Sequence, residues 1–488
     1  MLSKNCDVLV IGGGGAGLAA AIESREAGAE TILLEKNATL GGSTAWSIGS
    51  FTATQTPQQI NAGITDSPDE HFIDMPKFAG PLANRDNPEL RRLYVENANE
   101  TLRWLMSHGI EFFGPMPEPP HTKPRMHNVL PNSRAYITRL EAHARKIGVD
   151  IRLNCGAKEF LQEGGRVIGA RCKDGTEIIS GVTILTSGDY SASPELKNQY
   201  ISDSVSKVDA MNPTATGDGH KMALDIGGRI INGDVLSGPT LRFIPPKTET
   251  LQRMLPATPL MGKIMRVALQ YAPSWLLRPF VLRFTVTSMA PELDLFRNGA
   301  LLINKRGERI TSEATKLGTE IAQHPDKIGY VLMDQELAKR YSKWPDFIAT
   351  APGVSYAYFD DFRRTRKDIF LEASSLGDLA VRLGVDKDVL VTSVDSHNQD
   401  NTHQISKPPF YALGPAKSYI VLTDGGLAVN EQLQLLGEND NPVPGLYAAG
   451  SSGQGGLMLK GHGHHIGWAF TSGRLAGKNA AREALGKN

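Results

Sequence analysis

A glycine-rich turn near the N-terminus, in the stretch DVLVIGGGGAG from Asp7 to Gly17, constrains the fold of this chain more than any other feature. The apolar run before it, residues 8–11, is typical of a buried parallel strand, and the run LAAAIESREAGA after it is typical of a helix. Gly12, Gly14 and Gly17 have the spacing with which glycines permit a sharp turn, a close approach to a pyrophosphate and close helix packing. The turn therefore predicts a Rossmann-like α/β domain.

A second strand and an acidic residue follow at the distance that a dinucleotide site needs. Residues 31–34, TILL, are expected to form a second strand that leads into Glu35, whose carboxylate suits a ribose hydroxyl. The helix that follows the glycines presents free N–H groups and its positive dipole end to phosphates. The cofactor contacts predicted in this region, besides the three glycines, are Gly15, Ala16, Glu35 and Lys36.

Length and charge exclude several classes of protein. The chain has 488 residues, which is more than one core usually reaches, so two domains or one split domain are expected. Its 52 basic and 52 acidic residues balance, with no dense basic run, which argues against a nucleic-acid partner. The first strand begins at once and leaves no room for a signal peptide, so we expect a cytoplasmic protein.

The cysteines indicate neither a metal centre nor a disulfide framework. Cys6, Cys155 and Cys172 lack metal-ligand spacing, and the chain has no haem-attachment or iron–sulfur motif. Any electrons must therefore pass to or from an external partner. The tract GHGHH at residues 461–465 resembles a chelating sequence, but no acidic residue lies near it, and we predict no metal.

One stretch, residues 261–286, is apolar enough to consider as a membrane contact. Its longest uncharged run, between Arg266 and Arg278, is far shorter than the roughly 20 residues of a spanning helix. Residues 275–277 beside Arg278 and Arg283 are compatible with weak contact to a bilayer surface, although an apolar lid or an oligomer contact is favoured. The oligomeric state is left open.

The loop LGGSTAWSIGS at residues 40–50 resembles the flavoprotein family that includes soluble fumarate reductases and 3-ketosteroid dehydrogenases. The resemblance implies FAD, bound non-covalently because the first histidine, His71, lies well past this loop. It also implies that Trp46 and Phe51 lie near the flavin, with ordinary core packing as an equal alternative. The loop residues implied at the cofactor are Gly41, Gly42, Ser43 and Thr44.

Further segments resemble the same family in the family's order along the chain. They include VTILTSG at 182–188, TGDGHKMA at 216–223, TDGGL at 423–427 and PVPGLYAAG at 442–450. The last is GHGHHIGWAFTSGRLAG at 461–477, which would begin a helix aimed at the flavin. The remaining cofactor residues implied are Ala157, Ser187, Gly188, Asp218, Gly450, His465 and Ile466.

The resemblance also predicts how the chain is divided. Residues 1–280 and 408–488 are expected to form a split FAD-binding domain. Residues 281–407 are expected to form an inserted α+β capping domain, since GALLINKRGERITSE at 299–313 resembles a capping-domain motif. Three antiparallel strands are expected over 149–187, with turns at Gly164-Gly165 and Asp174-Gly175.

The active site matches neither branch of the family fully. The position of the proton-donating arginine of the reductases is Leu317, and apolar Val421 and Leu422 stand where those enzymes carry histidine. The tyrosine of the dehydrogenase motif Y-x-G-x-G is replaced by Leu459, although both glycines remain. The candidates for catalysis are therefore Lys460, His462, Gly463 through its N–H, and Tyr419.

These substitutions predict an apolar small-molecule substrate. The favoured reaction is α,β-desaturation of a cyclic or steroid-like ketone, with hydride passing to the flavin and electrons to an external acceptor. The first alternative is reduction of an activated C=C bond with an external donor. The second is a non-catalytic flavin-binding redox sensor.

Overall fold

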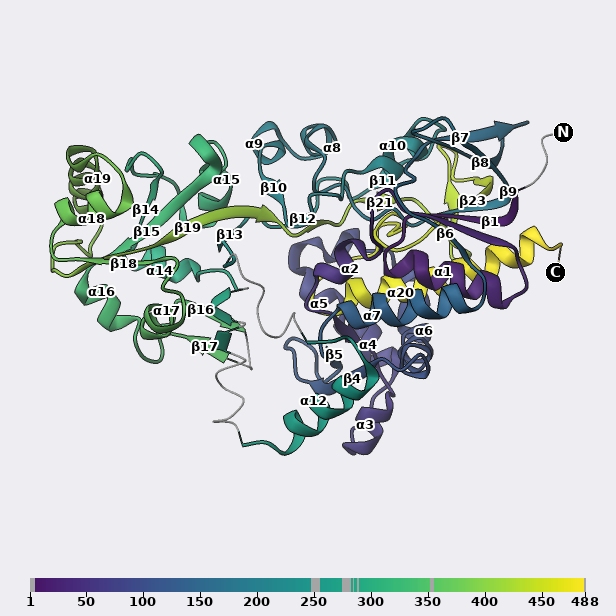
Figure 1. Ribbon diagram of the computed structural model, residues 1–488, viewed down its shortest axis with the longest axis horizontal. Coiled ribbons are helices and arrows are strands. Elements are labelled where there is room, and N and C mark those ends of the chain that lie inside the picture. Colours follow the sequence, from purple (N-terminus) through teal and green to yellow (C-terminus); the bar gives the residue numbers. More distant parts are fainter. Residues whose placement is uncertain are drawn as a thin grey trace.

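The computed structural model describes residues 5–246, 255–273, 282–283, 285–287, 289–351 and 355–486. Figure 1 shows a larger lobe, which carries both ends of the chain, and a smaller lobe beside it. The larger lobe contains the glycine-rich turn, in the loop between β1 and α1.

The main sheet of the larger lobe has the strand path β22-β23-β9-β1-β2-β6. Neighbouring strands of this path are parallel, except that β22 is antiparallel to β23. The strands are β1 (Cys6–Ile11), β2 (Thr31–Leu34), β6 (Asp150–Arg152), β9 (Glu177–Leu185), β22 (Gln434–Leu436) and β23 (Pro442–Ala448). This sheet confirms the predicted α/β fold and the strands expected at 8–11 and 31–34.

An antiparallel meander continues from β9. β7 (Ala157–Glu163) pairs with β8 (Arg166–Cys172), and β8 pairs with β9. Gly164 and Gly165 turn the chain between β7 and β8 with φ values of 57° and 80°, which glycine adopts without strain. The meander therefore follows the two predicted turns.

Two helices cover one face of the main sheet in close contact with each other. They are α1 (Gly15–Glu26) and α20 (His464–Ala484), drawn in purple and yellow in Figure 1. A Cβ atom at Gly473 would lie 2.3 Å from the Ala16 carbonyl oxygen, and one at Gly477 would lie 2.4 Å from that of Ala20. These two positions therefore need glycine for the helix contact.

The larger lobe continues with short elements between residues 42 and 146. Pro76 and Pro88 each open a new helix, and two strands form between residues 111 and 130. The elements are α2 (Gly42–Trp46), β3 (Ser50–Thr52), α3 (Pro57–Asn61), α4 (Pro68–Asp74), α5 (Pro76–Ala79), the 3-10 helix η1 (Gly80–Arg85), α6 (Pro88–Ser107), β4 (Glu111–Met116), β5 (Met126–Leu130) and α7 (Arg134–Lys146).

Short elements also connect the two lobes. α10 lies beside the meander, and β12 pairs with β20 next to the start of the smaller lobe. These elements are α8 (Pro194–Tyr200), α9 (Asp203–Ser206), α10 (Asp218–Leu224), β11 (Ile230–Ile231), β12 (Leu236–Ser237), β20 (Leu422–Thr423) and β21 (Gly426–Leu427).

The smaller lobe is built on a second, mostly antiparallel sheet with the path β10-β19-β15-β14, to which β13 and β18 add by pairing with β19. Its strands are β10 (Asp209–Ala210), β13 (Thr240–Phe243), β14 (Leu301–Asn304), β15 (Ile328–Met333), β18 (Phe370–Ala373) and β19 (Phe410–Ile420). The other elements are α14 (Leu293–Arg297), η2 (Ala314–Lys316), α15 (Leu317–Ile321), η3 (Pro325–Lys327), α16 (Gln335–Arg340), β16 (Ala349–Ala351), β17 (Ser355–Ala357), α17 (Phe359–Thr365), α18 (Leu376–Leu383) and α19 (Lys387–Asp400).

The second sheet includes strands that the predicted division assigns to the FAD-binding part. β13 precedes residue 281 and β19 follows residue 408, yet both pair with each other and β19 pairs with β15 and β18. The division at 281 and 408 stays a prediction, and hydrogen bonding places these two strands with the capping sheet.

The stretch considered as a membrane contact is described only in part. Residues 275–278 lie outside the described residues, while α12 (Pro259–Tyr271) and the exposed Arg283 lie within them. Leu260, Ile264 and Val267 of α12 are more than half exposed. Among the helices that the structure describes, none has the length and apolar character to cross a bilayer.

Candidate active site

A cavity opens where the carboxyl ends of β1, β2, β9 and β23 meet the start of α1, α2 and α10. This is the edge of a parallel sheet at which nucleotides bind in doubly wound folds. The predicted cofactor residues that line it are Gly12, Gly14, Gly15, Ala16, Glu35, Lys36, Gly42, Ser43, Thr44, Ala157, Ser187, Gly188, Asp218 and Gly450.

The glycines form a cradle that side chains would fill. A Cβ atom at Gly14 would meet only the Gly41 carbonyl oxygen, at 3.9 Å, and one at Gly42 would meet only the Gly14 Cα, at 3.8 Å. A Cβ atom at Gly188 would meet nothing within 4 Å. Because these positions open into the cavity, a pyrophosphate can approach the backbone there, and the site fits FAD.

Glu35 is held at the edge of the cavity by backbone donors. Gly13 donates its N–H to Glu35 Oε2 at 2.9 Å, and Asn37 donates its N–H to Oε1 at 2.8 Å. An acidic oxygen fixed in this way keeps free lone pairs for a hydroxyl of the ligand.

Lys36 and Asp218 interact with each other. The Lys36 Nζ atom lies 3.0 Å from Asp218 Oδ2 and 2.6 Å from Thr216 Oγ1. Burial opposes ionisation of Asp218, but Lys36 and Thr216 hold its pKa below the usual value. The pair therefore joins the end of β2 to the start of α10 on one wall of the cavity.

Four predicted cofactor residues do not line the cavity. Gly17 supports the turn, because a Cβ atom there would lie 1.8 Å from the Gly12 carbonyl oxygen. Gly41 donates its N–H to the Gly13 carbonyl at 2.9 Å. Ile466 packs against the core of the larger lobe, and His465 contacts an aspartate instead.

Asn212 and Cys155 are among the residues of the cavity wall that sequence reasoning missed. Asn212 donates from Nδ2 to Ser43 Oγ at 2.9 Å and so positions a predicted cofactor residue. Cys155 also lines the cavity, just before β7. Neither residue belongs to the motifs on which the sequence prediction was based.

The two aromatic residues near the G-G-S-T loop behave differently. Phe51 is fully buried and packs edge-on against Phe112, at 6.3 Å between ring centres. Trp46 is 54% exposed. Core packing, the alternative considered for both, therefore describes Phe51 alone.

Lys460 is placed by a buried carboxylate. Its Nζ atom pairs with Asp424 Oδ2 and donates to the Leu236 carbonyl at 3.3 Å, while His465 Nε2 lies 3.2 Å from Asp424 Oδ1. Asp424 is 1% exposed; burial opposes its ionisation, but His465 and Lys460 hold its pKa well below the usual range. The carboxylate therefore stays charged and holds Lys460 and His465 beside the start of α20.

The sequence prediction did not include Asp424. The residue stands at the variable position of the segment TDGGL, and this is the signal that points to it. An acidic residue at that position has no visible partner in the sequence, because Lys460 follows 36 residues later.

His462 and Gly463 lie at the start of α20. The His462 side chain is 60% exposed, and its Nδ1 atom lies 2.5 Å from Glu118 Oε1, a contact that raises its pKa. Gly463 precedes the helix with φ +86°, and a Cβ atom there would lie 2.6 Å from Thr52 Oγ1. The predicted N–H donor therefore depends on glycine at this position.

Tyr419 lies in β19 and pairs with Thr240 of β13. Lys460 instead donates to Leu236, which pairs with Thr423, four residues after Tyr419 in the sequence. Four residues of strand span about 13 Å. Burial raises the pKa of Tyr419, which keeps its hydroxyl protonated at neutral pH. Tyr419 is thus set apart from the other three candidates.

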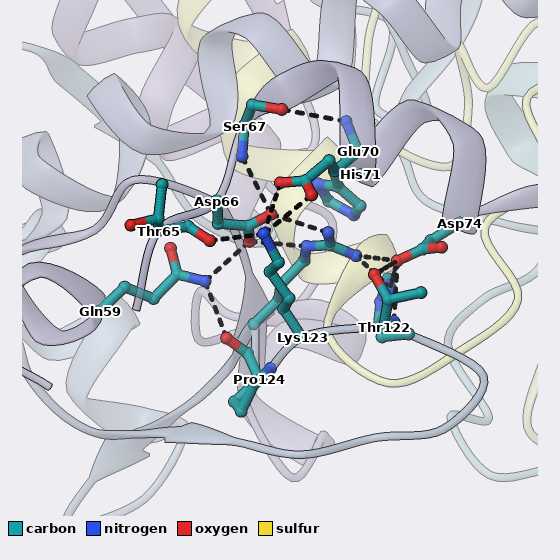
Figure 2. A network of polar contacts seen from close by, with 12 residues as sticks. Gln59, Thr65, Asp66, Ser67, Glu70, His71, Asp74, Thr122, Lys123 and Pro124 are labelled. Carbon is teal, nitrogen blue, oxygen red and sulfur yellow. Dashed lines mark hydrogen bonds and ion pairs between the residues drawn. The ribbon is translucent and has the colours of Figure 1, made fainter. Parts of the chain in front are cut away.

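Arg125, in the loop before β5, belongs to a buried network, and Figure 2 shows its partners Asp66 and Asp74. It donates twice to Asp66, at 2.8 Å each, and also pairs with Asp74. Thr122 donates its hydroxyl to Asp74 at 2.7 Å, and Lys123 donates to Glu70 at 2.8 Å. The network ties the loop at 117–125 to α4. His127 is likewise buried and bonded to Thr56.

Three buried histidines lie next to this network and are the one candidate metal cluster among the described residues. Ring nitrogens of His71, His121 and His464 lie within 4.8 Å of one another. His464 Nδ1 contacts the Lys460 carbonyl at 2.7 Å, so Nδ1 carries its proton, and His71 Nε2 lies 3.1 Å from His464 Nε2.

The ring nitrogens of these three histidines are poorly suited to bind a metal cation. Arg125 can only donate, so His121 Nδ1, 3.0 Å from its guanidinium, accepts and the proton sits on Nε2. That nitrogen then has no lone pair for a metal, and the guanidinium charge stands beside it. The absence of a metal site stays a prediction, and the tract at 461–465 contributes only His464 to the cluster.

Comparison with known proteins identifies the family. A family model described as "FAD binding domain" matches residues 7–254 and 269–458. The chain is 26% identical to NADH:fumarate oxidoreductase of Klebsiella pneumoniae, over 99% of this chain and 48% of that protein. It is 26% identical to a probable fumarate reductase of Shewanella frigidimarina, over 99% of this chain and 76% of that protein. A vinyl phenol reductase of Lactiplantibacillus plantarum is 24% identical, over 98% and 96% of the two chains.

Solved structures share the fold. The open form of a flavocytochrome c3 fumarate reductase has a TM-score of 0.73 at 23% identity, covering 99% of this chain and 79% of that one. The 3-ketosteroid Δ1-dehydrogenase of Sterolibacterium denitrificans has a TM-score of 0.64 at 19% identity, covering 98% and 99%. Both branches of the predicted resemblance are therefore found. The chain belongs to the FAD-binding family whose model it matches and is, as the sequence predicts, an FAD-dependent oxidoreductase.

Proposed function

We propose that this protein reduces the activated C=C bond of a weakly charged organic substrate, with electrons from an external donor. The observation that carries the proposal is the ion pair between Lys460 and the buried carboxylate of Asp424. Reduction is the first alternative predicted from the sequence, and the Lys460–Asp424 ion pair favours it over desaturation.

Reduction of a C=C bond needs a hydride at one carbon and a proton at the other. FAD, when bound, would supply the hydride chemistry. The chain must supply an acid, and Lys460, an N–H donor paired with the ionised, buried Asp424, is the candidate. A desaturase needs a base in the same place, and an ammonium ion paired with a carboxylate is not a base.

Similarity to named relatives supports the same direction. The relatives named above include reductases of fumarate and of vinyl phenol, and both compounds carry a C=C bond. The chain spans about half the length of the first relative and about three quarters of the second. We therefore do not assign the electron donors of those proteins to this chain. Val421 and Leu422 support an apolar substrate, because neither can bind a carboxylate.

Anaerobic reoxidation of the dithionite-reduced protein tests the proposal. Fumarate, acrylate, 4-vinylphenol and a cyclic enone would be added separately, and return of the oxidised flavin absorbance would be followed. An apolar alkene or enone should reoxidise the protein faster than fumarate does. Bleaching of the oxidised protein by saturated cyclic ketones, with no reoxidation by any alkene, would instead establish desaturation.

The lysine is tested in the same assay. Lys460→Met should slow reoxidation about 100-fold, the usual contribution of a general acid, and Lys460→Arg should restore part of the rate. Lys407→Met is the matched control, because Lys407 also pairs with a carboxylate, Glu336 at 2.7 Å, but in the smaller lobe. Equal rates for Lys460→Met and the control would remove Lys460 from the mechanism.

A further inference from the structure

Two cysteines whose spacing in the sequence suggests neither a metal site nor a disulfide framework lie next to each other in the fold. The Sγ atoms of Cys155 and Cys172 lie 3.1 Å apart, closer than two sulfur atoms in ordinary van der Waals contact. Both thiols are free in the structure. Cys172 ends β8 opposite Ala157, and Cys155 lies two residues before that partner, so the pair sits at the base of the β7–β8 hairpin.

The backbone around the pair is fixed by hydrogen bonds. Cys155 donates its N–H to the Glu35 carbonyl at 2.8 Å, and Lys173 donates its N–H to the Gly156 carbonyl at 2.8 Å. Backbone hydrogen bonds near the ends of β2 and β8 therefore hold the two cysteines next to each other. Cys155 also lines the cofactor cavity beside Glu35.

The two thiols differ in exposure. Cys172 is 1% exposed, and burial, together with its neighbour Cys155, raises its pKa. Cys155 is half-buried and opens to the cavity. A reagent thus reaches Cys155 first, and Cys172 stands ready as the resolving thiol.

We propose that Cys155 and Cys172 form a reversible intramolecular disulfide beside the cofactor cavity when the protein meets a low-molecular-weight disulfide, RSSR. The Cys155 thiolate attacks one sulfur of RSSR and releases RS⁻. The Cys172 thiol then gives up its proton and attacks Cys155 Sγ in the mixed disulfide, which releases the second RS⁻. Two protein thiols are oxidised to one S–S bond, and RSSR is reduced to two RSH that carry both protons.

Closure demands little movement of the protein. The sulfur atoms need to approach by about 1 Å to reach bonding distance. The bond joins residues 17 positions apart and closes the hairpin. Closing such a loop restricts the unfolded chain, so the oxidised protein should melt a few degrees above the reduced one.

The experiment uses the FAD-loaded full chain treated with oxidised glutathione. Wild type should lose two of its three thiols, and digestion with trypsin should release peptides 153–158 and 172–173 joined by a disulfide that dithiothreitol cleaves. Cys6→Ser is the matched control and should form the same linked peptides. Cys172→Ser should stop at a glutathione adduct on Cys155, and the rise in melting temperature should be absent.

Three results would overturn the proposal. One is a wild-type protein that keeps all three thiols at a glutathione disulfide concentration that modifies unfolded protein. Another is a linked peptide that appears only between two molecules. The third is equal loss of thiols in wild type and in Cys172→Ser. The wild-type thiol count needs no variant to fold, and it is independent of the reaction proposed above.

Discussion

Gly12 and Gly14 belong to one sequence motif, but the structure uses them in different ways. Gly12 has φ +108°, and a Cβ atom there would lie 2.5 Å from the Thr186 carbonyl oxygen. Gly14 has φ −77° and opens into the cavity. Gly12→Val should therefore disrupt folding, whereas Gly14→Val should fold and lose FAD, because its side chain fills the space of the pyrophosphate.

The ratio of flavin to protein absorbance, with far-ultraviolet circular dichroism as the folding check, measures this difference. Gly14→Val should retain native dichroism with at least a tenfold drop in bound flavin. Gly14→Ala, with a smaller side chain, should lie between it and wild type. Native flavin content in Gly14→Val would show that the cofactor does not pass over this glycine.

For single residues, the sequence could predict what chemistry a side chain offers better than it could predict which side chain lies beside it. The candidates Lys460 and His462 lie beside carboxylates that no local pattern reveals, since Asp424 and Glu118 are 36 and 344 positions away. Tyr419 was grouped with them on residue type alone. Side chains that meet only through the fold leave no spacing to read in the sequence.

Three elements bring buried, neutral histidines together: His71 comes from α4, His121 from the loop before β5 and His464 from α20. Burial and the neighbouring rings lower the pKa of His121 to about 2 and that of His464 to about 4, and they lower the pKa of His71 as well. An unfolded histidine has a pKa near 6.5. The unfolded state therefore binds more protons between these values, and the folded state loses stability as the pH falls.

Stability should thus drop between pH 6.5 and pH 4, by about 3 kcal/mol from His464 alone. Urea denaturation at a series of pH values measures the slope. His121→Gln keeps an acceptor for Arg125 and should flatten the slope. Identical slopes in wild type and His121→Gln would contradict the assignment.

Elements were predictable where local chemistry decides them. The β7–β9 meander follows from two glycine turns, and β1 and β2 follow from apolar runs. The region at 67–131 is decided less locally. Pro76 and Pro88 each open a new helix there, and β5 pairs with both β4 and the distant β3. Pairing between distant segments overrides local composition there.

The whole molecule contains separate hydrophobic cores. One is built from residues between 6 and 223 and between 427 and 481, and two adjoining cores of the smaller lobe use residues between 241 and 416. A small cluster of Val205, Val208, Ala322 and Ile420 joins the lobes. Cores that share no side chains are expected to unfold as separate units, which offers a test of the predicted capping domain.

Calorimetry should therefore resolve two unfolding transitions. FAD at about 100 times its Kd stabilises the lobe that binds it by about 2.7 kcal/mol and should raise only that transition. Arg366, which donates to the Ile244 and Val286 carbonyls at 2.7 and 3.0 Å, is 2% exposed in the smaller lobe. Arg366→Met leaves both carbonyls without this donor and should lower only the other transition. A single transition that both changes move together would mean that the two lobes fold as one cooperative unit.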